Sequence, residues 1–355
     1  MRAVKAGNLI IMLNSNDFHK AIELIDKSGS ILITTHTKPD GDACGCMAAL
    51  AEAFATPGKK VQLLPVSSVP QWYAFLFNEK VPMLGEDVSV EQLTEGHLGQ
   101  FDLLIIVDTN SYSQLPKLEQ YIKHIKKPIL VIDHHVTSDS LGDVELVDSG
   151  AAATGLIVYD LFKYANWQVT EKIAQALFVA IATDTGWFKF SNTDSRVFRT
   201  CAELLNAGAN PTELHHNLYE NFSAQRFRLM LAMLNTLELH FDGRYATQHI
   251  MQQDFIRTGT TYKDTENLIN ECQRIGTVEV AALFVELKDG RIRCSLRSKG
   301  SVDVSDIAAK FGGGGHKMAA GTYLPSPIED AMRLICEQVA DQMDWKGKSK
   351  GRVGL

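Results

Sequence analysis

Four apolar, β-branched runs in the first half of the chain constrain its fold more than any other feature. The runs are ILITT (31–35), VQLLPV (61–66), DLLIIVD (102–108) and PILVIDHH (128–135). Their apolarity is continuous rather than alternating, which suits strands buried on both faces of a parallel sheet. Helix-like segments accompany them at 43–55, 115–125, 151–165 and 170–184. We therefore predict an α/β fold with a parallel sheet covered by helices.

The character of the sequence changes after about residue 225. Asp242-Gly243 and Asp289-Gly290 are typical of hairpin turns, and a glycine-rich stretch, FGGGGHKMAAG, follows the second of them. These features predict a smaller α+β domain. We expect a larger parallel-sheet domain over residues 1–194, a helical connector over 195–225, the smaller domain over 226–343, and a disordered, basic tail over 344–355.

Composition and charge exclude some classes of protein. Of the 355 residues, 45% are hydrophobic and 22% are charged, and no apolar run is long enough to span a membrane. The six cysteines form no Cys-x-x-Cys pair, which favours a cytoplasmic protein with buried thiols. A net charge of −7 argues against a binder of long nucleic acids. A small anionic substrate remains compatible with this charge if metal ions neutralise it locally.

Side chains of the kinds that bind metal ions follow several apolar segments. They are His36, Asp40 and Asp42 after the first run, Asp108 at the end of the third, Asp133, His134 and His135 at the end of the fourth, and Asp184 at the end of 170–184. Ligands of open α/β sheets bind outside the carboxyl ends of the strands. We therefore expect these side chains to converge in one crevice.

The number and kind of these groups predict a metal centre. Uncompensated buried charges cost several kcal/mol each, so such a cluster requires cations. A mixed set of imidazoles and carboxylates suits Mn²⁺ or Mg²⁺ better than structural zinc. Six or seven ligands are too many for one ion, and paired divalent ions recur in phosphoester hydrolysis. The residues therefore predict a two-metal phosphohydrolase.

Five motifs also resemble those of a known family. THTKPDGDA, VDTNS, VIDHHVT and ATDTGWFKFSNT resemble, in order, the four motifs of the DHH phosphoesterases. FGGGGHKMAAG resembles the glycine-rich signature of the DHH-associated nucleic-acid-binding domain. The resemblance covers nearly the whole chain. It is strongest to the short two-domain members, which degrade very short oligoribonucleotides and remove the 3′-phosphate of 3′-phosphoadenosine 5′-phosphate (pAp).

The resemblance implies a role for each residue of the cluster. His36, Asp40 and Asp108 would hold one ion, and Asp42, Asp108, His134 and Asp184 the other, so that Asp108 bridges the two. Water activated by the ions would be the nucleophile. His135 matches a phosphate-contacting histidine that could protonate the leaving oxygen. Asp133 would orient a histidine or the loop.

Residues of the smaller domain are expected to hold the substrate. Gly313, Gly314 and Gly315 would let backbone N–H groups approach a phosphate, and His316 could bond to a nucleotide or stack on it. Arg297 would grip a phosphate with two hydrogen bonds. The helix entry SGAAATG is richer in alanine than the resemblance leads us to expect, which leaves Thr154 as its main hydroxyl.

These expectations define one function and its alternatives. The leading hypothesis is a hydrolase of short 5′-phosphorylated RNA, with pAp phosphatase activity, that uses Mn²⁺, or alternatively Mg²⁺ or Co²⁺. Its partners would be short single-stranded RNA and small nucleotides, with no membrane, and family analogy suggests a homodimer. Cyclic dinucleotides or the linear products pApA and pGpG are alternative substrates. A nucleotide-binding regulator is the alternative that is not an enzyme, and the intact set of acidic ligands argues against it.

Overall fold

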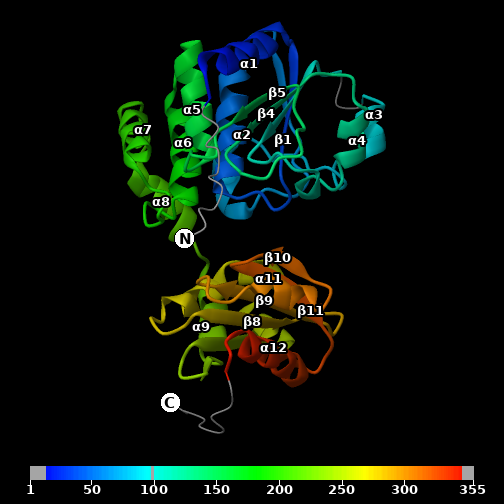
Figure 1. Cartoon of the computed structure of the whole chain (residues 1–355), viewed down its shortest axis with the longest axis vertical. Coiled ribbons are helices and arrows are strands. Elements are labelled where there is room, and N and C mark those ends of the chain that lie inside the picture. The colour runs from blue at the N-terminus through cyan, green and yellow to red at the C-terminus, as the bar shows by residue number, and fades with distance from the viewer. Residues whose placement is uncertain (1–12, 97–99, 346–355) are drawn as a thin grey trace, which may run out of the picture. The chain divides into compact units, whose positions relative to one another are not determined.

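A computed structural model of the protein describes residues 13–96 and 100–345 and divides into two compact units, Met1–Asn221 and Phe222–Leu355. Both units contain a β-sheet with helices packed on it (Figure 1). The 346–355 part of the expected disordered tail lies outside the described residues. No helix in the described ranges is both long and apolar enough to cross a membrane.

The first unit contains a five-stranded sheet in which all strands are parallel. Its strands are β1 (Ser30–Thr35), β2 (Lys60–Leu63), β3 (Leu103–Val107), β4 (Ile129–Asp133) and β5 (Val144–Val147), in the order β2-β1-β3-β4-β5. The predicted parallel sheet is confirmed. β5 was not among the predicted strands. Its segment VELV is short and only partly buried, and so lacks the long apolar run that marks β1, β3 and β4.

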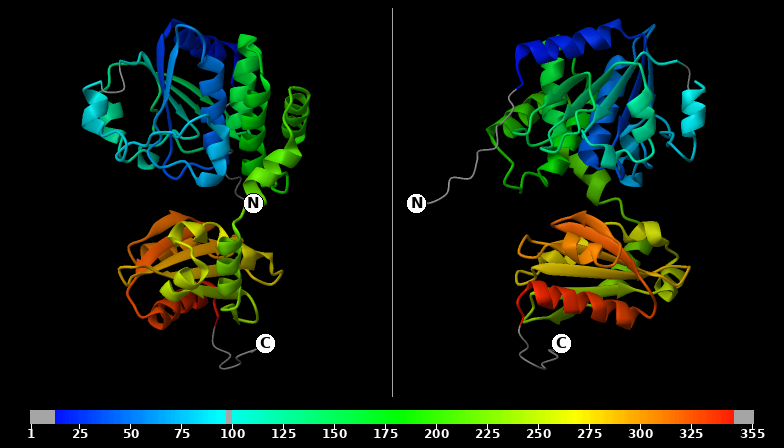
Figure 2. Two further views of the ribbon diagram at one scale, coloured as in Figure 1. Left: turned by 180° about the vertical axis from the view of Figure 1, so that it is seen from behind. Right: turned by 45° about the vertical axis from the view of Figure 1, so that its right-hand side comes forward.

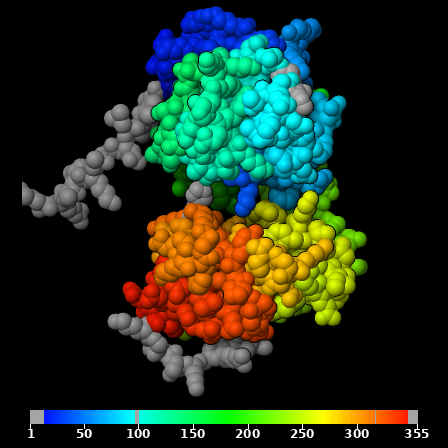
Figure 3. All heavy atoms as spheres, turned by 90° about the vertical axis from the view of Figure 1, so that its right-hand side faces the viewer, coloured from blue at the N-terminus to red at the C-terminus, as the bar shows by residue number. Residues whose placement is uncertain are grey.

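Helices cover both faces of this sheet (Figure 2). One core contains alternate strand residues such as Ile31 and Ile105 and joins them to α1 (Ser15–Lys27), α2 (Gly41–Phe54), α5 (Thr154–Ala165), α6 (Glu171–Asp184), α7 (Ser195–Asn206) and α8 (Pro211–Tyr219). The other core contains Leu32 and Leu104 and joins α3 (Val90–Thr94) to α4 (Glu119–His124). Figure 3 shows this second side, where α3 and α4 are coloured cyan to blue-green. Short 3₁₀ helices lie at Gln71–Leu76 and Tyr112–Gln114.

The second unit contains a six-stranded mixed sheet. Its strands are β6 (Glu238–His240), β7 (Tyr245–Ile250), β8 (Val280–Glu286), β9 (Ile292–Ser298), β10 (Gly314–His316) and β11 (Ala319–Leu324), in the order β10-β11-β9-β8-β7-β6. Only β7 and β8 pair in parallel. Asp242-Gly243 and Asp289-Gly290 join β6 to β7 and β8 to β9, both antiparallel pairs. The predicted α+β fold of this part is confirmed.

The helices of the second unit form two cores with its sheet. One core contains α11 (Val304–Ala309) and α12 (Ile328–Gln342), and the other contains α9 (Ala224–Leu234), α10 (Gln252–Thr258) and a 3₁₀ helix at Leu268–Arg274. A further 3₁₀ helix spans Tyr262–Thr265. Trp345 lies against Phe241, with ring centroids 5.4 Å apart. The chain therefore stays packed up to the last described residue.

The segment expected as a connector, 195–225, is helical along most of its length. Its helices α7 and α8 belong to the first unit, and the division between units falls after Asn221. Val197, Cys201 and Leu204 of α7 are buried in the first core. α7 and α8 are thus part of the packing of the first unit.

Candidate active site

The metal-binding side chains are positioned by the ends of strands and helices. His36 follows β1, and Asp108 follows β3 with a left-handed backbone (φ 60°), which is uncommon outside glycine. Asp133 is the last residue of β4, directly before His134 and His135. Because β1, β3 and β4 are adjacent and parallel, their carboxyl ends meet at one edge of the sheet.

Two helices bring the remaining acidic residues to this edge. Asp40 caps the N-terminus of α2, where its Oδ1 accepts the backbone N–H groups of Asp42 and Ala43. Asp42 lies in the first turn of the same helix and is only 1% exposed. Asp184 is the last residue of α6. Capping therefore fixes the Asp40 carboxylate, and the start of α2 and the end of α6 place Asp42 and Asp184 at the same edge.

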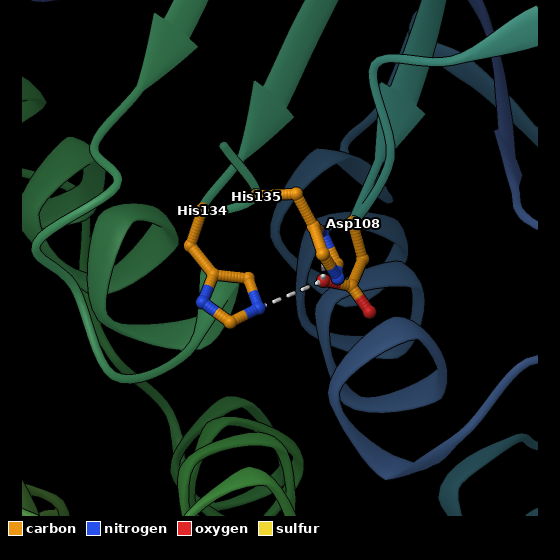
Figure 4. Close-up of side chains that lie close together, drawn as sticks. All are labelled: Asp108, His134 and His135. Atoms are coloured by element: carbon orange, nitrogen blue, oxygen red, sulfur yellow. Dashed lines mark ion pairs between the residues drawn. The ribbon is translucent and has the colours of Figure 1, made fainter. Parts of the chain in front are cut away.

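Asp108 lies at the centre of the cluster and is 2% exposed. Its Oδ2 lies 3.3 Å from His36 Nε2. Its Oδ1 lies 3.7 Å from His134 Nε2 and 3.9 Å from His135 Nδ1, and Figure 4 shows the three side chains together. The two oxygens of one carboxylate thus face two different sets of side chains.

Three overlapping groups of potential ligands lie around Asp108, each with ligand atoms within 4.8 Å of one another. One group is His36, Asp40 and Asp108, a second is Asp42, His134 and Asp184, and the third is Asp108, His134 and His135. In the second group, His134 Nε2 lies 3.9 Å from Asp42 Oδ2 and 3.5 Å from Asp184 Oδ2. The structure thus brings together all six residues predicted as metal ligands.

The electrostatics of the cluster fit a cation site. Burial, followed by the neighbouring charges of Asp108 and Asp184, raises the pKa of Asp42 well above its usual value. Burial also raises the pKa of Asp108, with a further contribution from Asp40, and that of Asp184. Bound cations would replace the protons that these carboxyl groups otherwise favour. The donor set of carboxylates and imidazoles is one that divalent ions such as Mn²⁺ accept.

His135 is held by Asp133. Its Nδ1 lies 2.7 Å from Asp133 Oδ1, and this hydrogen bond is the main cause that raises the pKa of His135 to about 9. The same Oδ1 accepts the backbone N–H groups of His134 and His135. Asp133 is fully buried, whereas the His135 side chain is 53% exposed. The His135 ring is therefore half exposed to solvent beside the acidic cluster, and its hydrogen bond to Asp133 favours the protonated form.

Two contacts involve residues outside the predicted set of site residues. Thr154 donates a hydrogen bond from its hydroxyl to Asp108 Oδ1 at 2.8 Å. Asn192 donates from its side-chain amide to the backbone oxygens of Ala152 and Asp184. The motif FSNT contains Asn192, and its position shortly after Asp184 is the only signal that could have identified this residue.

In the second unit, the glycine-rich stretch is held by close backbone packing. A Cβ at Gly313 would lie 2.3 Å from the backbone oxygen of Gly321, and one at Gly315 would lie 2.4 Å from that of Ala319. Gly314, in contrast, has open space where a Cβ would be. Glycine is thus required at two of the three predicted positions by the packing of Gly313 and of β10 against β11.

Arg297 and His316 occupy one row across the second sheet. His316 pairs with Ala319, and Ala319 pairs with Arg297 of β9. The side chain of His316 lies outside the part of the structure that is described. Burial lowers the pKa of the Arg297 guanidinium, and the charge of Glu266 opposes this shift. Nη1 of Arg297 donates a hydrogen bond to the backbone oxygen of Leu296 at 3.1 Å.

Comparison with known proteins agrees with this site and this fold. Residues 30–181 match the DHH family, N-terminal domain, and residues 242–343 match the DHHA1 domain. The chain belongs to the DHH phosphoesterase family, whose members are metal-dependent hydrolases. It is 31% identical to the bifunctional oligoribonuclease and PAP phosphatase NrnA of Thermus thermophilus, over 92% of this chain and 93% of that protein.

Two further proteins are similar at lower sequence identity. The cyclic-di-AMP phosphodiesterase PdeA of Listeria monocytogenes is 25% identical over 92% of this chain but only 49% of its own length. An exopolyphosphatase-related protein from Bacteroides fragilis has a crystal structure that superposes with a TM-score of 0.83 at 20% identity. That alignment covers 96% of this chain and 100% of the other, and it shows that the fold is shared.

Proposed function

We propose that the protein is a two-metal phosphoesterase that hydrolyses short 5′-phosphorylated oligoribonucleotides to mononucleotides and also dephosphorylates pAp. The observation that carries this proposal is the position of Asp108, whose two oxygens face two separate groups of ligands. The choice of substrate is supported by the similarity to NrnA, which extends over nearly the full length of both chains.

Two divalent ions, with Mn²⁺ as the first candidate, fit the ligands present. His36 and Asp40 would hold one ion, Asp42, His134 and Asp184 would hold the other, and Asp108 would contact both. Mg²⁺ and Co²⁺ are alternatives, although imidazole ligands favour Mn²⁺ and Co²⁺ over Mg²⁺. When bound, such a pair lowers the pKa of water and stabilises the charge that develops on the phosphoryl group.

His135 is proposed as the general acid. The hydrogen bond to Asp133 raises the pKa of His135 to about 9, which favours the protonated ring that a general acid needs, and half of the side chain is open to solvent. Donation of this proton to the leaving oxygen would avoid the release of an unstable alkoxide. Asp133 would hold the ring in place through the 2.7 Å contact with Nδ1.

The second unit is proposed to bind the substrate. Arg297 would pair with a phosphate, and the backbone of Gly313, Gly314 and Gly315 would approach the nucleotide together with His316. The position of Arg297 in one row with Ala319 and His316 across the second sheet supports this role. A cytoplasmic location agrees with six free cysteines, and the homodimer stays a prediction.

A substrate panel tests the proposed function. Purified protein with excess Mn²⁺ would be incubated with pAp, pApA, a ladder of short 5′-phosphorylated RNAs, cyclic di-AMP and pyrophosphate, with EDTA as a control. We expect fast release of mononucleotides from the shortest RNAs and of phosphate from pAp. Metal-dependent turnover of none of these substrates would contradict the proposal.

The similarity to PdeA favours one second candidate, a phosphodiesterase for cyclic di-AMP or its linear product pApA. The same panel separates the two. Turnover of cyclic di-AMP without turnover of pAp or of the RNA ladder would support this alternative in place of the oligoribonuclease.

A further inference from the structure

Thr154 contacts two carboxylates of the cluster at the same time. Its backbone N–H donates to Asp42 Oδ2 at 2.6 Å, and its hydroxyl donates to Asp108 Oδ1 at 2.8 Å. The Thr154 side chain is fully buried. Asp42 lies at the start of α2, and Asp108 directly follows β3. Thr154, the first residue of α5, therefore connects these two carboxylates through its hydrogen bonds.

The first contact is explained by how α5 begins. The residue before it, Ala153, has no side-chain oxygen with which to cap the helix, so the first N–H groups need another acceptor. Asp42 is that acceptor, because its Oδ2 takes the N–H of Thr154 and its Oδ1 takes the N–H of Gly155 at 2.9 Å. The carboxylate of α2 therefore caps α5, and the positive end of the α5 dipole favours its charged form.

Glycine at position 155 allows this close approach. A Cβ there would lie 2.7 Å from the Cβ of Ala180 and 3.4 Å from Asp42 Oδ1. The beginning of α5 is thus pressed between α6 and the Asp42 carboxylate, and its position relative to the site is fixed. This fixed position determines where the hydroxyl of Thr154 points.

The second contact fixes the orientation of Asp108. The terminal torsion of an aspartate has broad energy wells, so its carboxylate needs an external partner to hold one orientation. The Thr154 hydroxyl binds Oδ1, on the side of His134, while Oδ2 lies toward His36. An oxygen that accepts one hydrogen bond keeps a lone pair free for a metal ion. Thr154 is therefore suited to hold both oxygens toward their respective ligand groups.

We propose that Thr154 is a positioning residue that fixes the relative placement of two metal ions by holding Asp42 and Asp108. This inference rests on the proposed function, because a bridging orientation of Asp108 matters only if two ions bind. Loss of the hydroxyl frees Oδ1 of Asp108, while the backbone contact to Asp42 remains. The ion on the His134 side then loses a preorganised ligand.

The test compares Thr154→Val, which removes the hydroxyl at nearly the same shape, with Thr154→Ser, which retains it. Thr34→Val is a matched control, because Thr34 is also fully buried and its hydroxyl donates to the backbone oxygen of Leu64. Mn²⁺ would be titrated into each metal-free full-length protein. Free Mn²⁺ and the exchange-coupled signal of a Mn²⁺ pair would be followed by electron paramagnetic resonance.

For Thr154→Val we expect one site of normal affinity, a second site weakened about 10- to 100-fold, and a reduced coupled signal. Thr154→Ser and Thr34→Val should bind like the wild type. Two normal sites with a full coupled signal in Thr154→Val would overturn the inference, as would equal losses in Thr154→Val and Thr34→Val.

Two further outcomes are separable. Should Thr154→Val fail to fold in EDTA, Thr154→Ala removes the same hydroxyl with less bulk and is judged by the same criteria. A wild-type protein that forms no coupled Mn²⁺ pair would overturn both this inference and the two-metal function. If the wild type forms a coupled Mn²⁺ pair and the Thr154 variant binds Mn²⁺ in the same way, the role of Thr154 would be overturned and the two-metal function would stand.

Discussion

Asp108 combines a left-handed backbone conformation, burial and contacts on both of its oxygens. Such a conformation costs about 1–3 kcal/mol in a residue other than glycine and persists where the surroundings enforce it. The order of the motifs predicted that Asp108 would lie with His36 and His134, because each follows a strand. It did not predict the Thr154 contact, which depends on where α5 begins relative to β3.

At the same scale, the pair of Asp133 and His135 predicts a pH effect. Asp133→Asn removes the charged acceptor that raises the pKa of His135, so this pKa should fall from about 9 toward its usual value of 6.5. Because the acid must be protonated to act, the alkaline limb of the kcat/KM profile should move to lower pH. A pH–rate series with pApA measures this shift, and His135→Gln should remove the limb. An unchanged alkaline limb in Asp133→Asn would contradict the assignment.

At the scale of elements, the long apolar strands and helices were predictable, since continuous apolar runs and capping signals mark them locally. β5 was not, because four residues with one buried side chain carry too weak a pattern. The VQLLPV run also extends beyond its strand, since β2 ends at Leu63 before Pro65. The backbone N–H of Leu64 still donates to the oxygen of Ile33 on β1 at 2.9 Å, and Pro65 follows on the edge strand of the sheet, where proline is tolerated.

The crossing of α2 and α6 gives a prediction for stability. A Cβ at Gly45 would lie 2.4 Å from the backbone oxygen of Ala176 and 2.8 Å from the Cβ of Ala180. Gly45→Ala should therefore destabilise the protein by about 1–3 kcal/mol, since the two helices must separate. It should also weaken Mn²⁺ binding, because α2 carries Asp42 and α6 carries Asp184.

Thermal unfolding and Mn²⁺ titration measure these two effects. Gly276→Ala is the control, because a Cβ there would meet no atom within 4 Å, and it should be close to neutral. Equal stability of Gly45→Ala and the wild type would show that the close helix contact does not constrain the site.

At the scale of the whole molecule, the hairpin signals and the glycine-rich stretch after residue 225 predicted a second domain. The comparisons assign different domains to the two parts. The details of the division could not be read from the sequence. Whether α7 and α8 pack on one unit or link two depends on distant contacts, such as those of Leu204 with the first core. Local signals, such as the glycine at position 208 that follows α7, do not contain that information.

The first unit is proposed to bind the metal ions and the second to bind the substrate, so substitutions in the two units should cause different kinetic defects. Arg297→Ala, in the second unit, should raise KM for pApA about 10- to 100-fold, because a charge-assisted hydrogen bond contributes about 1.5–3 kcal/mol. Its effect on a small generic phosphodiester should be minor. Arg274→Ala is a control in the same unit, since Arg274 is exposed and pairs with Glu271. Equal losses on both substrates in Arg297→Ala would argue against a substrate-binding role.

Metal binding and stability should be linked through pH. Burial raises the pKa of Asp42, Asp108 and Asp184, so the folded metal-free protein binds more protons than the unfolded chain. Its stability should therefore fall as pH rises above about 4, through the interval between the unfolded and folded pKa values. Mn²⁺ replaces these protons, so the gain in Tm on adding Mn²⁺ should be larger at about pH 8 than at about pH 5. A gain that is equal at both pH values would contradict this linkage.

The most direct test of the two-metal account is the turnover of a 5′-phosphorylated dinucleotide by Asp108→Ala in excess Mn²⁺, compared with the wild type. Asp108 faces both proposed ion sites through its two oxygens, so its loss should lower kcat/KM at least about a thousandfold, or roughly 4 kcal/mol of transition-state stabilisation. Thermal unfolding would establish that the variant is folded. The account predicts a folded, nearly inactive protein, and turnover by Asp108→Ala at the wild-type rate would contradict it.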